Sequence, residues 1–460
     1  MAWALDVLWG SSPRAGGRLL LALLVAACAL AADNRRTDDL RLIGAVRQRD
    51  HQALAELLAR HADLNASHPD GATALAWAVY LDDSSAAEAL VAAGAKVETA
   101  DEYGETPLTL ACANGNAGLV RKLLQAGADA NRARWNGETA LMIAARVGNL
   151  EAVSQLIEHG ASVNAAESRK GQTALMWAAA GKHPEIARLL LAHGAEVNAA
   201  SKAGFTALVF AAMKNDSKSV ERLLAAGADA NYRLPDGTRT LSVAAAYRSA
   251  SAAIALIDGG AEANVMDGAG NTPLHAAAQL GSLELVKKLL EKGADPDPRT
   301  ATAPEGRGGG DFRRATGEET PLMLAAKAGH ADAMRALVEG GADPALKAQD
   351  GTTLLMAAAS SAHLDAVKYA YELDSDTKAV NNRGTTVTHY AVTAFTAKAT
   401  QAEICQVVQF LADKGAPLDT PDARGRTPLA IADTIPLESV FDLITRLVIQ
   451  AGGVPTKSKR

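Results

Sequence analysis

The sequence predicts an all-α solenoid built from repeated pairs of short helices. A leucine recurs at a nearly constant spacing along much of the chain. A fixed period of this kind is typical of arrays in which each unit packs only on its neighbours. Hydrophobic residues make up 48% of the sequence but aromatic residues only 4%, which favours closely packed helices over sheets. The leucines that mark the period are Leu75, Leu108, Leu141, Leu175, Leu208, Leu241 and Leu274.

The stretch from residue 270 to residue 295 shows what one unit contains. Gly270 and Asn271 suit a tight turn with positive φ, and Pro273 fits the first turn of a helix, where no backbone donor is lost. Gly281 and Gly293 are placed to end a first and a second helix. Each helix carries one apolar stripe at three- and four-residue spacing, formed by Leu274, Ala277 and Ala278 and then by Leu283, Val286, Leu289 and Leu290. Such a helix pair leaves one flank uncovered, so a further copy must stack on it.

The repeated motifs resemble those of the ankyrin-repeat family. The turn and first helix recur as GATALAWAV, GETPLTLAC, GETALMIAA, GQTALMWAA and NTPLHAAA, and the second helices end in GADAN, GASVN, GAEVN and GADPD. The resemblance extends over nearly all of residues 38–453, because period, turn chemistry and both helix signatures agree. It implies an ankyrin-repeat stack of helix pairs joined by β-hairpin fingers, with a concave face made of fingers and first helices.

The resemblance also implies which residues contact a partner. In this family, contacts come from residues that flank each turn glycine and from the pair that follows the two alanines of the first helix. Transferred to this sequence, these positions are Tyr103, Trp135, Arg146, Arg169, Lys170, Lys202, Phe205, Met213 and Tyr247. Clusters of aromatic residues and arginine are typical of binding hot spots. The alternative for each ring is local packing against the neighbouring finger, and Trp77 and Trp177, which precede the packed alanines of their helices, are expected in the core.

The repeat pattern divides the chain into segments of different regularity. Residues 32–299 contain an atypical N-terminal cap and the regular repeats. Residues 300–317 are polar and glycine-rich and have no helical period, so they are expected to form a flexible insertion loop. Residues 318–453 contain irregular repeats with a C-terminal cap, and residues 454–460 form a basic tail expected to be disordered.

Residues 1–31 have the features of a secretory signal peptide. Arg14 and Arg18 precede an apolar run, and the small residues at 29–31 suit a cleavage site after Ala31. The chain is therefore expected to be exported to the periplasm or the extracellular space of a bacterium. The alternative is a membrane-anchored lipoprotein, because the residues before Cys28 resemble a bacterial lipoprotein signal and would place a lipid anchor on that cysteine. No stretch reaches the ~20 apolar residues that a transmembrane helix needs.

The sequence contains no pattern typical of a catalytic, cofactor or metal site. There is no HExxH and no CxxC, so no zinc site is expected. By the resemblance, His275 and His389 are structural residues of the turn before the first helix. The formal net charge of -6 gives no basic field for nucleic acid.

These observations predict a non-catalytic scaffold that binds a partner protein on its concave face. The alternative is an enzyme or a small-ligand-binding subunit that uses the 300–317 loop and the irregular C-terminal repeats. A pocket with convergent titratable groups would favour that alternative, whereas a continuous open groove would count against it. Fold alone does not identify the partner.

Export makes a testable prediction about the mature N-terminus. Because the apolar run is followed by small residues, we expect signal peptidase to leave Ala32 as the first residue, or a lipid-modified Cys28 under the alternative. Intact-mass spectrometry of the protein purified from its own cell distinguishes the two. A protein that retains Met1 would contradict both.

Overall fold

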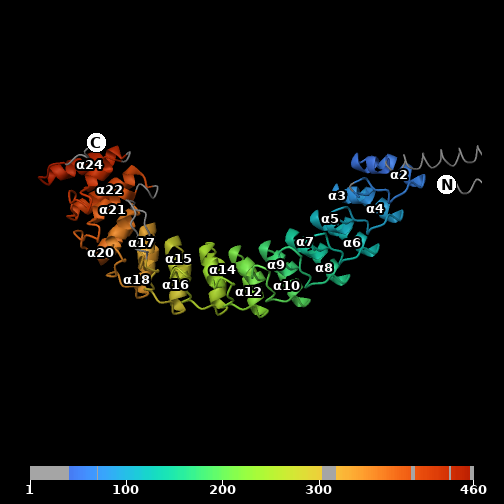
Figure 1. Ribbon diagram of the computed structural model, residues 1–460, viewed down its shortest axis with the longest axis horizontal. Coiled ribbons are helices and arrows are strands. Elements are labelled where there is room, and N and C mark those ends of the chain that lie inside the picture. Colours follow the sequence, from blue (N-terminus) through green and yellow to red (C-terminus); the bar gives the residue numbers. More distant parts are fainter. Residues whose placement is uncertain (1–40, 70, 303–316, 395–398, 435–436, 456–460) are drawn as a thin grey trace, which may run out of the picture. The chain divides into compact units, whose positions relative to one another are not determined.

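The computed structural model describes residues 41–69, 71–302, 317–394, 399–434 and 437–455. Over these residues it is all-helical, with short helices in consecutive pairs (Figure 1). The chain divides into two units, residues 1–196 and residues 197–460, which we describe separately. The all-α prediction is confirmed. The predicted signal peptide, residues 303–316 of the insertion loop and residues 456–460 of the tail lie outside the described residues.

The first unit begins with helical residues 41–47, followed by regular helix pairs. Its helices are α2 (His51–Ala59), α3 (Ala74–Tyr80), α4 (Ser84–Ala92), α5 (Pro107–Ala113), α6 (Ala117–Gln125), α7 (Ala140–Val147), α8 (Leu150–Glu158), α9 (Ala174–Ala180) and α10 (Pro184–Ala192). Helices α3, α5, α7 and α9 pack side by side in one layer, and α4, α6, α8 and α10 form the second layer.

The second unit continues the pattern and becomes less regular toward its end. Its helices are α11 (Ala207–Met213), α12 (Ser217–Ala225), α13 (Thr240–Ala246), α14 (Ala250–Asp258), α15 (Pro273–Leu280), α16 (Leu283–Glu291), α17 (Pro321–Ala328), α18 (Ala331–Glu339), α19 (Leu354–Ala359), α20 (Leu364–Leu373), α21 (Val387–Thr393), α22 (Gln401–Asp413), α23 (Pro428–Ala432) and α24 (Glu438–Gln450). Odd-numbered helices pack on odd-numbered neighbours and even-numbered helices on even-numbered ones.

The helix boundaries follow the local sequence signals. Pro273 occupies the start of α15, and Gly281 ends that helix in the left-handed conformation with φ of 66°, as predicted. Most first helices begin after a threonine whose hydroxyl accepts a backbone N–H, as Thr73 does from Ala76 at 3.2 Å. Because two glycine or turn positions interrupt every repeat, the helices of the regular repeats stay shorter than three turns.

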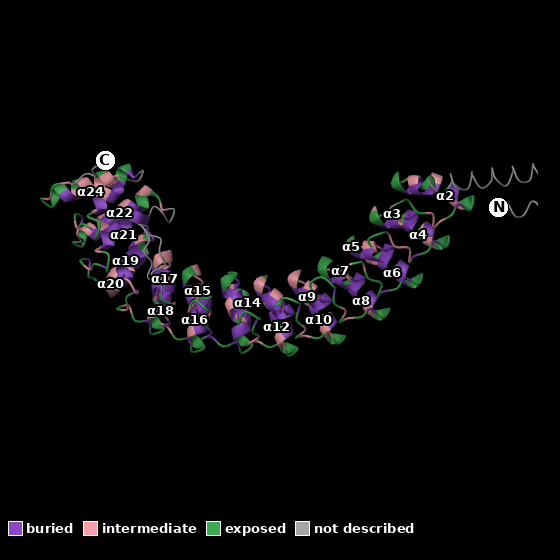
Figure 2. Ribbon diagram, viewed as in Figure 1, coloured by how far each residue is buried: buried purple, intermediate pink, exposed green. Residues whose placement is uncertain are grey.

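The core lies between the two layers of each unit (Figure 2). In the first unit, α7 packs on α8, and Leu141 and Ala144 of α7 and Leu156 of α8 are each at most 1% exposed. Alanine on the first helix lets the second helix approach closely, and a leucine or valine fills the remaining space. No helix in the described part of the chain is long and apolar enough to cross a membrane.

The fingers between helix pairs are less sheet-like than expected. The described residues contain isolated antiparallel bridges, such as Ala133 with Thr139 and Ala166 with Thr173, and no extended strand. The predicted β-hairpin fingers are therefore not confirmed. Neighbouring fingers are nevertheless joined through their backbones, since Ser168 N–H donates to Asn136 O at 2.8 Å.

An asparagine in the loop after most second helices joins each repeat to the next. The Asn131 amide donates to Gly160 O at 2.8 Å, and its oxygen accepts from Ser162 N–H at 2.7 Å. The same two bonds are made within the first unit by Asn164, and within the second unit by Asn198, Asn231 and Asn264. A side chain must both donate and accept to make this pair of bonds, which explains the asparagine in GADAN and GASVN.

Asp297 occupies the asparagine position in the repeat before the insertion. Its carboxylate accepts from Asp343 N–H at 3.0 Å, but a carboxylate cannot donate to a carbonyl. Burial, together with the negative charges of Asp343 and Asp295, raises the pKa of Asp297 above its ordinary value. The charged form is therefore less favourable in the folded state than in the unfolded chain.

Replacing Asp297 with asparagine is expected to stabilise the second unit. The asparagine side chain can donate to the Gly341 carbonyl, and it carries no disfavoured charge. Together these two changes are expected to raise the unfolding free energy by about 0.5–1.5 kcal/mol at pH 7. Because the folded pKa is raised, this gain shrinks as the pH falls through that pKa and Asp297 becomes neutral. Denaturant unfolding at several pH values measures it.

The reciprocal variant Asn264→Asp is the matched control for this prediction. It places a carboxylate at a regular position and should destabilise the protein by a similar amount, because the Gly293 carbonyl loses its donor. Equal stability of all three proteins would contradict the assignment of the asparagine bonds as links between repeats.

Candidate partner-binding surface

The residues predicted to contact a partner lie on finger turns and at the ends of first helices. In one finger, Asp101 Oδ1 accepts from the Tyr103 N–H at 2.9 Å and so fixes the turn. Gly104 in this turn has φ of 78°. A Cβ atom there would lie 3.1 Å from Arg134 Cα and from the Trp135 nitrogen, so glycine is needed for the next finger to come this close.

Tyr103 and Trp135 form an exposed aromatic pair on these neighbouring fingers. The Tyr103 side chain is 59% exposed and that of Trp135 is 69% exposed. The Trp135 N–H donates to the Tyr103 carbonyl at 3.3 Å, which holds the two backbones together. The hydrogen bond and charge of Glu102 raise the pKa of the Tyr103 hydroxyl, which therefore stays neutral. Two rings lie open to solvent on backbones that are already fixed.

Arg134 links the same two fingers through ion pairs. Its guanidinium contacts Glu105 of the preceding finger at 2.5 Å and Glu138 of its own finger at 2.9 Å. All three side chains are mostly buried, at 15% to 23% exposure. A buried pair of this kind holds geometry because removal of one partner leaves an uncompensated charge. Arg134 is therefore a positioning residue for the exposed rings.

Arg169 and Lys170 lie exposed on the next finger, which is one residue longer. Glu167 supports it, because its carboxylate accepts from the backbone N–H groups of Arg169, Lys170 and Gln172 at 2.7 to 3.1 Å. Burial raises the pKa of Glu167, but these three bonds outweigh it and hold the pKa below its ordinary value. The carboxylate thus stays charged while it fixes the turn.

Trp77 and Trp177 occupy equivalent positions of α3 and α9 and are half-buried instead of fully buried in the core. Each indole is covered on one face by an arginine from the preceding repeat. The guanidinium carbon of Arg47 lies 4.7 Å from the Trp77 ring centroid, and that of Arg146 lies 4.7 Å from the Trp177 ring centroid. Tyr80, which is 60% exposed, packs edge-on against Trp77.

In the second unit, two of the predicted contact residues also have a packing role. Phe205 and Met213 are half-buried and pack on a cluster formed by Val209, Leu234 and Val243. The Phe205 ring lies 5.7 Å from that of Phe210, centroid to centroid, in a tilted arrangement. For Phe205 and Met213, local packing competes with a role in binding. Tyr247, in contrast, is 57% exposed, and Lys202 is exposed beside Ser201.

Sequence reasoning missed Arg47 and Tyr80. Both lie at the end of a first helix, at the position that Arg146 occupies in its own repeat. The position was a detectable signal, but the first repeat, which contains Arg47, lacks the turn motif. Of the nine predicted contact residues, Tyr103 and Trp135 are directly joined, with Arg146, Arg169 and Lys170 in the same unit. That all nine residues share one concave face stays a prediction.

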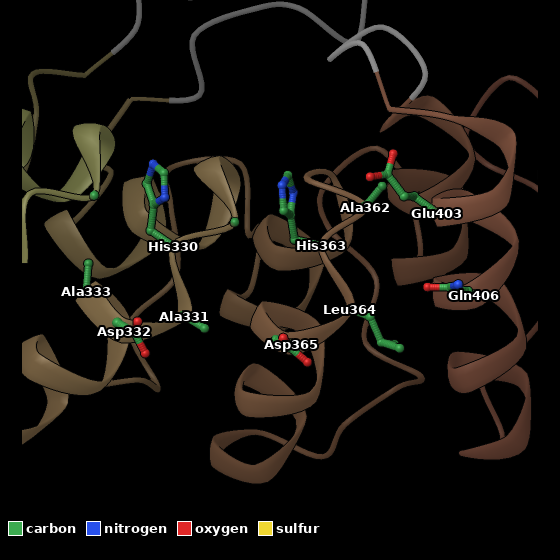
Figure 3. Close-up of a pocket in the computed structure, with 12 residues that line it drawn as sticks. His330, Ala331, Asp332, Ala333, Ala362, His363, Leu364, Asp365, Glu403 and Gln406 are labelled. Atoms are coloured by element: carbon green, nitrogen blue, oxygen red, sulfur yellow. The ribbon is translucent and has the colours of Figure 1, made fainter.

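The second unit contains a groove of about 560 Å³. It is a candidate for the pocket that an enzyme or a small-ligand-binding subunit would need. Its lining includes His330, His363, Asp332, Asp365 and Glu403 (Figure 3). The two imidazoles point the same way from the starts of α18 and α20 (Figure 3). Titratable groups therefore line one groove here, but the two imidazoles point the same way and not toward each other (Figure 3).

The contacts of these groove residues are those of repeat packing. A Cβ atom on Gly281 would lie 2.6 Å from the His330 ring, and one on Gly329 would lie 2.4 Å from the His363 ring, so each imidazole packs on a helix-ending glycine. His363 Nδ1 donates to Ser361 O at 2.9 Å. Glu403 accepts from the backbone and hydroxyl of Thr400, each at 2.8 Å. The lining residues that the structure describes include no serine, threonine, cysteine, lysine or tyrosine to act as a nucleophile.

His275 and His389 are structural residues, as predicted. His275 Nδ1 accepts from Thr272 N–H at 3.0 Å, and its Nε2–H donates to Glu319 O at 3.0 Å. His389 makes the equivalent bonds to Thr386 and Arg426. Burial lowers the pKa of both imidazoles, which keeps them neutral and able to donate and accept at once.

The remaining reactive groups that the structure describes are not placed for metal or thiol chemistry. Within the described residues, no group of three or more His, Cys, Asp or Glu side chains is placed to hold a metal ion. Cys112 and Cys405 are free. Burial raises the pKa of Cys112 to about 12 and also raises the pKa of Cys405, so both thiols are protonated and unreactive at neutral pH.

Comparison with known proteins identifies the repeats. A family model described as ankyrin repeats in three copies matches residues 42–134, 113–201, 208–300 and 322–402. No curated protein matches the sequence.

Proposed function

Because the chain belongs to the ankyrin-repeat family, whose repeats are generally protein-interaction modules, we propose that it is a non-catalytic scaffold that binds a partner protein through its fingers and first helices. The observation that carries this proposal is the aromatic pair Tyr103 and Trp135, each more than half exposed on neighbouring, backbone-linked fingers. In a chain with only 4% aromatic residues, exposed rings on rigid supports are unusual. Large rings held in place lose little entropy on binding and are typical hot spots.

Exposed positive side chains in the same unit support this surface. Arg146, Arg169 and Lys170 are exposed in the same unit, whereas Arg134 is held by Glu105 and Glu138. Exposed basic groups around apolar rings resemble the polar rim of a protein interface. The net charge of -6 argues against a nucleic-acid partner.

We propose further that the protein acts after export, in the periplasm or outside the cell. The support is the basic and apolar leader of residues 1–31. A lipid anchor at Cys28 is the variant of this proposal in which the same surface works at a membrane. In both cases the repeats, which begin soon after the leader, meet partners outside the cytoplasm.

The double variant Tyr103→Ala and Trp135→Ala tests the binding surface. Affinity capture with the wild-type chain from the producing cell, followed by mass spectrometry, supplies the partner. We expect the double variant to weaken binding of that partner by roughly 2–4 kcal/mol, because two hot-spot rings are lost. Calorimetry or surface plasmon resonance gives the affinity.

Two controls separate binding from folding. Exposed finger side chains contribute within about 0.5 kcal/mol of stability, so the thermal midpoint of the double variant should stay close to wild type. Ile449→Ala removes a 58% exposed side chain from α24 and should leave the affinity unchanged. Unchanged affinity in the double variant would reject this surface, and a collapsed midpoint would show that the two rings are structural.

A further inference from the structure

The two arginine–tryptophan pairs of the first unit indicate which chemical groups the partner presents. Arg47 on Trp77 and Arg146 on Trp177 have the same geometry, at 4.7 Å from ring centroid to guanidinium carbon. The indoles lie at equivalent positions of α3 and α9, three repeats apart. The arrangement therefore occurs twice on one side of one unit.

The arginines, and not the tryptophans, are available to a ligand. Both indole N–H groups are buried and have no acceptor, so they point away from any ligand. Arg47 and Arg146 are exposed, and neither guanidinium makes a hydrogen bond or an ion pair with a described residue. Arg134 instead contacts two glutamates, and Arg49 donates to the Leu81 carbonyl. The pairs thus present two oriented guanidinium groups whose N–H edges are unused.

Stacking prepares these groups to bind carboxylates. The flat indole face limits the rotamers of the arginine, so less entropy is lost when a ligand binds. The guanidinium edge offers N–H donors in a fork that matches the two oxygens of a carboxylate.

The distance between the pairs sets the length of the ligand. Neighbouring helices pack about 8–10 Å apart, so three repeats separate the two guanidinium groups by roughly 24–30 Å. An extended chain advances about 3.3 Å per residue and covers this distance in about eight residues. Between Arg47 and Arg146, α3 and α5 present apolar surface of Tyr80, Leu110 and Ala113, which are at least partly exposed.

We infer that the first unit binds an extended protein segment with two acidic residues about eight positions apart and apolar residues between them. The acidic side chains bind Arg47 and Arg146, and the segment lies across the ends of α3 and α5. This inference rests on the proposed binding function and names the chemistry of the partner at that surface.

Selection from a random peptide library tests the inference without knowledge of the natural partner. The full chain is immobilised at physiological salt, and displayed peptides of about 16 residues, long enough to span both pairs, are selected for binding. We expect selected peptides to be enriched in two Asp or Glu residues about eight positions apart. Selection of peptides without acidic pairs, or of no peptide at all, would overturn the inference.

Charge variants test the same peptides in solution. Arg47→Gln and Arg146→Gln should each weaken a selected synthetic peptide about tenfold, because a charge-assisted hydrogen bond is lost. Arg146→Lys keeps the charge but loses the fork and should weaken it almost as much. The control Arg121→Gln with Arg188→Gln removes equal charge from α6 and α10, where both arginines have glutamate partners, and should have no effect. If the Arg47 and Arg146 variants bind the selected peptide as tightly as the wild-type chain does, the inference is overturned.

Two further arms distinguish other ligands. In the first, phosphoserine replaces the acidic residues of the peptide. If the phosphoserine peptide binds more than tenfold tighter than the acidic peptide, the assignment to carboxylates is overturned. A single-stranded oligonucleotide that displaces the peptide at equal concentration would do the same. Peptides that lack acidic residues but lose binding in the Tyr103 and Trp135 double variant would reject this inference while leaving the proposed binding function intact.

Discussion

Each repeat of this chain depends on its neighbour to cover the apolar side of its own helix pair. Residues such as Leu141, Ala144 and Val153 are fully buried only because an adjacent pair packs on them. Polar bonds then fix how the pairs meet, through the asparagine side chains after the second helices and through His275 and His389 at the starts of first helices. Apolar coverage makes stacking favourable, and these directional bonds set its register.

The same requirement produces the surface that we propose for binding. Stacking in register places successive fingers side by side, so Tyr103 and Trp135 become neighbours although they belong to different repeats of the sequence. It also places an arginine of one repeat over a tryptophan of the next. Side chains on the outer edge of this stack are not needed for coverage. They are therefore free to vary with the partner, whereas the asparagines and histidines are tied to the stack.

Residues that act within one repeat could be predicted from the sequence. The start of α15 at Pro273, its end at Gly281 and the structural role of His275 follow from local turn and helix chemistry. Contacts between repeats were harder to predict. The half-buried state of Trp77 and Trp177 depends on arginines of the preceding repeat, and the packing of Phe205 depends on Leu234 and Val243.

The fingers show a second limit of sequence reasoning. The turn glycines were recognised, and Gly104 has the positive φ that its turn requires. The expected β-hairpins, however, reduce to isolated bridges in the described residues. The side chains of Asp101 and Glu167 accept hydrogen bonds from N–H groups of their turns instead. The groove at His330 and His363 was likewise not predicted, since it forms where consecutive helix starts meet.

The central claim is that the finger and first-helix side of the first unit binds the partner, and site-specific photocrosslinking in the producing cell tests it most directly. A photoreactive amino acid replaces Trp135 on a finger or Arg121 on α6 of the second layer, in otherwise identical chains. The account predicts a discrete covalent adduct from position 135 and none from position 121. An adduct from position 121 alone, or equal adducts from both, would contradict it.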